Sequence, residues 1–254
     1  MDSVHETVNK PGFGTFFRIF LRSFFLQGSW SQTHRQNLGF AYCMEPVGKI
    51  LWTDPVQYAR FLKRHTDYYN GNPFMSTLVL GAVVRMEETL RHGSGVTEDD
   101  IRRFKKVAGP ATGSVGDGMF WSALRPFALV LGLLCAVSYG IYGAVVFLAT
   151  FNIPACILRW YWLRAGYRHG HNVITELKNR RIRIGVRIMD LFGGVLIGLL
   201  AVLYLAQVEN GIAAVYLWSA ILFILSFTLL RRRYPLYLVF PASVGIAVVA
   251  GMVM

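Results

Sequence analysis

The chain has 254 residues, 54% of them hydrophobic, and its mean hydropathy of +0.41 is too high for an ordinary soluble domain. We therefore expect an all-α polytopic membrane protein. The net charge of +12 does not predict a nucleic-acid partner, because the basic residues do not form one water-facing patch. Of the twelve Lys and Arg residues after position 120, eight lie in 159–187, three in 231–233, and Arg125 is the last. We interpret these two basic segments as cytoplasmic loops between apolar spans.

The first 26 residues predict a flexible start followed by an interfacial helix. Residues 1–12 are polar and lack the apolar core of a signal peptide, so we expect them to be mobile and cytoplasmic. Residues 13–26 are mostly apolar, and Arg18 and Arg22 are four positions apart, on one face of a helix. The segment is too short to span a bilayer. This favours an amphipathic helix at the inner membrane surface, with both arginines on lipid headgroups.

The stretch 27–44 is the least ordinary part of the chain, because amides, hydroxyls and aromatic rings gather there. The residues with this chemistry that we single out are Gln27, Ser29, Trp30, Gln36 and Tyr42. Amides donate and accept hydrogen bonds at once, and an aromatic face can stack on the C–H face of a sugar ring. These groups suit a neutral polyhydroxylated ligand. The alternative is an interfacial turn whose Trp and Tyr lie among the headgroups.

Two helices are expected between residues 53 and 92. Asp54 and Pro55 begin the first, which runs to about Tyr69 and ends at Asn-Gly-Asn-Pro. His65 lies on it, where a solvated or capped histidine is favoured over a proton carrier. The second helix, 74–92, is apolar first and charged later.

The paired acidic residues Glu87 and Glu88 lie near the end of that second helix. They are functional or paired if the helix enters the bilayer. They are ordinary solvated residues if the helix lies on the surface.

Residues 95–109 predict a water-exposed helix capped by Thr97, with acidic residues first and basic residues after them. The following segment, 109–118, contains four glycines and a proline, and we expect irregular backbone there, passing between helices or lining a cavity. It lacks the Gly-Lys-Ser/Thr ending of a phosphate-binding loop. Asp117 at its end is interpreted either as the cap of the next helix or as a ligand-binding residue.

The C-terminal half is expected to be a bundle of transmembrane helices. Residues 120–158 are longer than one span, and breaks are possible at 139–140 and at 152–154. Three further spans are predicted at about 188–207, 212–230 and 236–254. The loop 209–211 carries no basic residue, so it and the C-terminus are predicted to face outward. Gly194 and Gly198 form a GxxxG pattern that is typical of close helix packing.

The three cysteines are scattered, two of them in apolar runs, and predict neither a disulfide framework nor a metal site. We expect no metal and no cofactor. The histidines are not in convincing catalytic settings, so we expect no catalytic residue.

Four segments of the chain resemble, in the same order, the IID membrane component of mannose-family sugar phosphotransferase systems. They are RSFFLQGSW (22–30) followed by LGFAYCM (38–44), FLKRHTDYYNGNPFM (61–75), LVLGAVVRMEE (78–88) and GPATGSVGDGMFWSALRP (109–126). Together they cover residues 17–126, and the hydrophobic C-terminal half fits the layout of the family.

The resemblance implies a subunit that pairs with a IIC membrane protein and holds a hexose-type sugar near the middle of the bacterial cytoplasmic membrane. Soluble IIA and IIB subunits would phosphorylate the sugar on the cytoplasmic side, so this chain would not be an enzyme. A trimer of IIC–IID pairs and an elevator-like movement are further implications. On this basis, 13–126 would be a substrate domain with interfacial and re-entrant helices, and 127–254 a transmembrane scaffold. Glu87, Glu88 and Asp117 join the five residues of 27–44 as sugar-binding candidates.

The sequence departs from the family after Gln-Gly-Ser-Trp. The family commonly has Asn-Tyr-Glu-Arg-Met-Gln there, whereas this chain has Ser-Gln-Thr-His-Arg-Gln at 31–36, with Thr33 in place of the acidic residue. The glycine-rich segment is also one residue longer than usual. These departures leave open a second interpretation, in which the chain is a structural or regulatory partner of a IIC-like protein and does not transport sugar.

Overall fold

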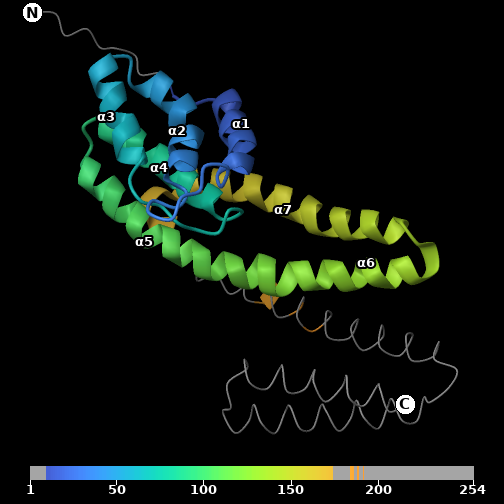
Figure 1. The fold of residues 1–254 in the computed structure, drawn as a ribbon. Coiled ribbons are helices and arrows are strands. Elements are labelled where there is room, and N and C mark those ends of the chain that lie inside the picture. Colours follow the sequence, from blue (N-terminus) through green and yellow to red (C-terminus); the bar gives the residue numbers. More distant parts are fainter. Residues whose placement is uncertain (1–9, 174–183, 186–187, 189–190, 192–254) are drawn as a thin grey trace, which may run out of the picture. The chain divides into compact units, whose positions relative to one another are not determined.

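The computed structural model describes residues 10–173, 184–185, 188 and 191 (Figure 1). The chain divides into two compact units, Met1–Gly194 and Val195–Met254, and every described residue lies in the first. The spans predicted at 212–230 and 236–254, nearly all of 188–207, the GxxxG pattern and the first nine residues lie outside the described part. The domain boundary expected at residue 126 stays a prediction.

The described part is helical and contains no strand. This confirms the expected all-α class, while the polytopic bundle is not confirmed. The elements are α1 (Phe13–Arg22), η1 (Ser23–Phe25), α2 (Asn37–Leu51), α3 (Pro55–His65), α4 (Ser76–Arg91), α5 (Glu98–Gly116), η2 (Asp117–Leu124), α6 (Arg125–Tyr139), α7 (Tyr142–His169) and η3 (Gly170–Asn172).

Helix α1 is amphipathic, as predicted, and buries Phe16 and Ile19 while Phe13 and Phe17 stay exposed. Arg22, which we expected on lipid headgroups, donates from its guanidinium to Glu45 over 2.6 Å. The interfacial position of the helix stays a prediction.

Helix α2 was not predicted from the sequence. Its buried positions Phe40, Met44, Val47 and Leu51 recur every three or four residues, which is the helical period. Gly39 near its start allows close packing, because a β-carbon there would overlap the backbone of Leu26.

The predicted beginnings of α3 and α5 are confirmed. The Asp54 carboxylate accepts a hydrogen bond from the Gln57 amide over 2.8 Å, and Pro55 is the first residue of α3. Thr97 caps α5 in a capping box with Asp100. Helix α3 ends at His65, four residues before the predicted end.

The prediction of irregular backbone at 109–118 is wrong, because α5 continues through Pro110 to Gly116 and then becomes the π-helical η2. Two of its glycines, Gly109 and Gly116, allow close packing instead of forming a loop. A β-carbon at Gly109 would lie 2.6 Å from the carbonyl oxygen of Asn70, and one at Gly116 would lie 2.5 Å from the Asn72 side chain. Asp117 therefore begins η2 within a continuous helical path.

Helices α6 and α7 form an antiparallel hairpin (Figure 1). Of the two predicted breaks, the one at 139–140 is correct: Gly140 has φ +56°, which favours glycine. The break at 152–154 is wrong, because Pro154 lies inside α7. Within the described residues, two helical stretches are long and apolar enough to cross a membrane, Glu98–Tyr139 and Tyr142–Asn172.

Part of the basic segment predicted as a loop is also helical. Arg159, Arg164 and Arg168 all lie on α7, so the prediction of a loop from residue 159 is wrong there. The rest of that segment is mostly outside the described residues.

Helices α4 and α7 cross at two glycines. A β-carbon at Gly81 would overlap the Leu163 carbonyl oxygen, and one at Gly166 would overlap that of Leu78. The two backbones therefore pack directly on each other, and α4 is buried along most of its length.

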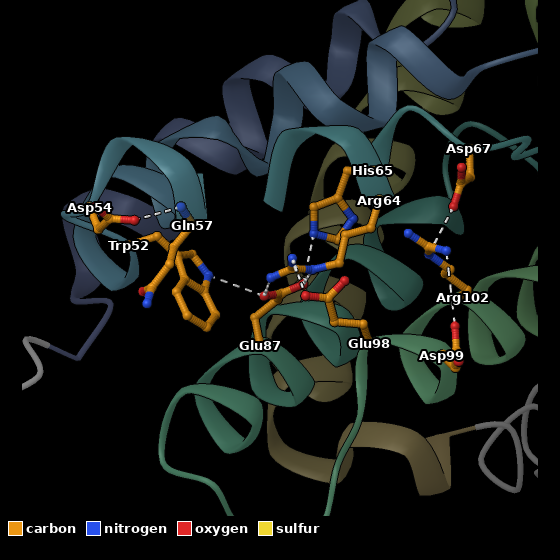
Figure 2. Close-up of polar contacts among 10 residues, drawn as sticks. All are labelled: Trp52, Asp54, Gln57, Arg64, His65, Asp67, Glu87, Glu98, Asp99 and Arg102. Atoms are coloured by element: carbon orange, nitrogen blue, oxygen red, sulfur yellow. Dashed lines mark hydrogen bonds and ion pairs between the residues drawn. The ribbon is translucent and has the colours of Figure 1, made fainter. Parts of the chain in front are cut away.

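A buried ion pair joins the helices around α4 (Figure 2). The Arg64 side chain, 1% exposed, donates to both carboxylate oxygens of Glu87, 0% exposed, over 2.7 and 2.6 Å. The Trp52 indole N–H donates to the same carboxylate over 3.2 Å, and Glu98 lies 3.5 Å from Arg64. The pair thus links the end of α2 with α3, α4 and the start of α5.

His65 lies against this pair, with its Nε2 3.0 Å from Glu87. Burial disfavours charge and lowers the pKa of His65 to about 4, although Glu87 acts in the opposite direction. Burial also opposes the charge of Glu87, but hydrogen bonds from Arg64 and the adjacent His65 outweigh it and lower its pKa. Because the His65 side chain is 0% exposed, the expectation of a solvated histidine is wrong.

We predict that Gly166→Ala destabilises the protein by about 1–3 kcal/mol, because its methyl group must displace the Leu78 backbone. Thermal unfolding in detergent measures this. Gly14→Ala is the matched control, since its added methyl meets nothing within 4 Å and alanine favours helix. Equal melting temperatures for both variants would contradict the close crossing.

We predict that Arg64→Met lowers the free energy of unfolding by about 3–5 kcal/mol, because it leaves the Glu87 carboxylate buried without its cation. The exposed Arg60 on the same helix provides the control, and Arg60→Met should change unfolding little. The double variant Arg64→Met, Glu87→Met should be more stable than Arg64→Met alone. If it is not, the loss does not come from an unpaired charge.

We predict that stability falls as the pH decreases from about 6.5 to about 4. In that window the unfolded chain binds a proton at His65, whereas the folded chain, with its lowered pKa, does not. Melting temperatures in detergent at several pH values measure the slope. His65→Gln should flatten it, and His34→Gln at an exposed position should not.

Candidate functional site

A polar cavity of about 400 Å³ lies where the loop after η1, the loop before α4 and one face of α5–η2 meet. The lining residues, in chain order, are Gln27, Gln36, Tyr68, Asn70, Gly71, Asn72, Pro73, Pro110, Gly113, Ser114, Asp117 and Trp121. Those from 110 to 121 recur at helical spacing, so they share one face of the helix. The cavity thus joins three segments that are far apart in the sequence.

Asn72 fixes the wall between the loop and the helix. Its side-chain N–H donates to the Asp117 carboxylate over 2.9 Å. Its side-chain oxygen accepts from the amides of Phe74 and Met75 over 3.0 and 3.3 Å at the start of α4. One buried amide therefore begins α4 and orients Asp117 at the cavity.

Gln36 fixes the opposite edge of the same loop. Its side chain donates to the Gly71 carbonyl over 2.9 Å and accepts from the Gly71 amide over 3.2 Å, while its own backbone N–H donates to Tyr69. Gln36 is buried, so its amide mainly holds the wall of the cavity.

The groups exposed at the cavity suit a small neutral polar ligand. Gln27, Asn70 and Ser114 offer amide and hydroxyl groups that can donate and accept, and Asp117 is an acceptor. Among the described lining residues none is Lys or Arg, so the cavity has no cation to hold a phosphate. This set matches the hydroxyls of a sugar better than an anion.

An aromatic cluster supports the apolar side of the cavity. The Phe74 ring stacks on Phe120 at 4.5 Å between centroids and meets Trp121 edge-on at 5.6 Å, and Phe151 of α7 packs against both Phe74 and Trp121. Trp121 is 40% exposed. A ring supported in this way can present its face to the C–H face of a sugar.

The residues predicted in 27–44 do not all meet at the cavity. Gln27 and Gln36 line it, whereas Ser29, Trp30 and Tyr42 are not among the lining residues. Trp30 is 48% exposed beneath the Arg35 guanidinium at 5.1 Å. Tyr42 is similarly covered by Arg22, at 4.4 Å.

Of the three acidic candidates, only Asp117 lines the cavity. Glu87 belongs to the buried ion pair with Arg64. Glu88 accepts from the Tyr167 hydroxyl over 2.9 Å and from Arg85 over 3.2 Å, which ties α4 to α7. Among the described residues, no group of three His, Cys, Asp or Glu side chains could hold a metal ion.

Sequence reasoning did not single out Tyr68, Asn70, Ser114 or Trp121. All four lie in the segments that carry the family resemblance. The spacing of Ser114, Asp117 and Trp121 would have indicated a shared face had 109–118 been predicted as helix.

Comparisons with known proteins agree with this resemblance. The chain is 30% identical over 179 residues to the mannose-specific EIID component of Escherichia coli strain K12, and 32% over 183 residues to the sorbose-specific EIID component of Klebsiella pneumoniae. It is 31% identical over 180 residues to the fructose permease IID component of Bacillus subtilis. These matches cover 68%, 70% and 69% of this chain but only 63%, 66% and 65% of the relatives. The chain thus matches just under two thirds of their length.

Solved structures share the fold. A chain of a complex described as the mannose transporter ManYZ with microcin E492 aligns with a TM-score of 0.61 and 24% identity, over 93% of this chain and 95% of that one. A second chain, described only as a membrane protein, aligns with a TM-score of 0.74 and 22% identity, over 96% and 98%. The family model for the mannose/fructose/sorbose IID component matches residues 14–234. The chain therefore belongs to the IID components of mannose/fructose/sorbose-family sugar phosphotransferase systems.

Proposed function

We propose that this chain is the IID membrane subunit of a sugar permease and that its polar cavity takes part in holding a neutral hexose-type sugar. The observation that carries this proposal is the cavity lining, in which amides, two hydroxyls, one carboxylate and a half-exposed indole converge without Lys or Arg among the described residues. Sugar recognition needs that combination of bidirectional hydrogen-bonding groups and an aromatic face.

The chain acts together with a IIC membrane subunit in the bacterial cytoplasmic membrane, with its N-terminus inside and its C-terminus outside. IIA and IIB subunits phosphorylate the sugar on the cytoplasmic side, and the product is thereby trapped. Trimers of IIC–IID pairs complete the proposed assembly.

The alternative is a structural or regulatory subunit that does not transport sugar. Its main support in the sequence is Thr33 in place of an acidic residue. Thr33 lies in an exposed turn, where its hydroxyl is 2.9 Å from His34, and it is not a lining residue. Because the altered residue is outside the cavity, its replacement removes no cavity ligand. This favours transport.

We predict that Trp121→Ala raises the KM for hexose uptake about tenfold, because loss of an aromatic contact of about 1.4 kcal/mol weakens affinity by that factor. Trp30→Ala is the matched control, since Trp30 is similarly exposed but outside the cavity. Uptake of labelled hexoses is measured in cells that also produce the IIC, IIA and IIB partners.

Assembly with IIC is measured in parallel by co-purification, so that a folding defect is not mistaken for lost binding. Trp121→Phe should restore most of the affinity. If Trp30→Ala impairs uptake more than Trp121→Ala, the sugar site is not this cavity. If the assembled wild type takes up no sugar, the regulatory interpretation replaces transport.

A further inference from the structure

Arg159 is a buried cation in the middle of α7, within one of the stretches that could cross a membrane. It is 4% exposed. Among the described residues no carboxylate lies within ion-pair distance of it, and its Nε has no hydrogen-bond partner there. Burying an arginine without an acid is costly, so a role beyond packing is expected.

The guanidinium makes its hydrogen bonds to the end of the N-terminal helix. Its Nη1 donates to the Ser23 carbonyl over 2.7 Å and approaches the Ser23 hydroxyl at 3.1 Å. Ser23 begins η1, and Gln27 of the cavity follows four residues later. Arg159 therefore ties the base of the Gln27 loop to α7.

The same guanidinium also contacts two aromatic rings, one of which belongs to the cluster that packs against Trp121. It lies 4.6 Å from the Phe24 ring centroid and 5.0 Å from that of Phe74. Phe74 follows the lining residues of the 70–73 loop directly and packs on Trp121. One cation thus joins the segment that carries Gln27 to the aromatic cluster that supports Trp121.

We propose that Arg159 is a positioning residue that holds the Gln27 loop and the Trp121 cluster at the separation that sugar binding requires. It acts through Ser23 and Phe74 and does not itself line the cavity. This inference rests on the proposed sugar-binding function. Methionine fills similar space, but it cannot donate to the Ser23 carbonyl and has no charge for cation–π contacts with the Phe24 and Phe74 rings. Lysine keeps the charge but loses the planar fork.

The test compares Arg159→Met and Arg159→Lys with Arg164→Met in the complex with IIC. Arg164 is a matched control, because it lies on the same helix with its guanidinium 4.9 Å from the Phe16 ring, away from the cavity lining. We expect Arg159→Met to raise the KM for hexose uptake about tenfold. This is the change in affinity that corresponds to the loss of one charge-assisted hydrogen bond. The maximal rate per assembled complex should change less than about twofold. Arg159→Lys should be intermediate and Arg164→Met unchanged.

A second readout does not depend on transport. Spin labels at Ser29→Cys, two residues after Gln27, and at Ser114→Cys on α5, in a background without the native cysteines, report the separation between the segment that carries Gln27 and α5. Both positions are exposed. We expect Arg159→Met to broaden the distance distribution and Arg164→Met to leave it sharp.

An unchanged KM and an unchanged distance distribution in the Arg159 variants would overturn the proposal. Failure of both Arg159 variants to assemble, with Arg164→Met intact, would make Arg159 a folding residue and also overturn it. If the assembled wild type takes up no sugar, the proposed function fails. The distance measurement then still decides whether Arg159 sets the separation of the two segments.

Discussion

The described unit depends on the side chain of Asn72, which joins three parts of the molecule through one buried amide. Its oxygen accepts hydrogen bonds from the amides of Phe74 and Met75, just before α4, and its N–H donates to Asp117 at the junction of α5 and η2. The contact is possible because Gly116 has no side chain at the point where Asn72 meets the helix. The hydrogen bonds that begin α4 therefore also shape the cavity, and they anchor its polar wall to the core.

The chain is highly apolar, yet it buries several charges, which make directional contacts between helices. Arg64 and Glu87 pair across α3 and α4, and Glu88 binds the Tyr167 hydroxyl between α4 and α7. Arg159 binds a carbonyl and two aromatic rings instead of an acid. These directional contacts fix how the helices cross, which apolar packing by itself leaves less specific.

Glycines allow close approach of the backbones of neighbouring segments, both in the core and beside the cavity. Gly81 and Gly166 bring α4 and α7 together, and Gly109 and Gly116 bring α5 to the 70–73 loop. The π-helical turn η2 follows directly, and its wider turn carries Asp117 and Trp121 at the cavity. Such π-helical insertions occur frequently at functional sites.

The sequence by itself determined the all-α class, the family, the caps at Asp54 and Thr97 and the break at Gly140, because each depends on local residue chemistry or on recognisable motifs. It did not indicate α2, and it indicated irregular backbone at 109–118. Glycine and proline normally weaken a helix, and the local sequence does not show the close packing that uses Gly109 and Gly116 here. Only the tertiary structure decided which polar residues meet. Gln27 and Asp117 share a cavity while Glu87 pairs with Arg64, because those contacts join segments far apart in the chain. Local composition does not reveal which segments, far apart in the chain, come into contact.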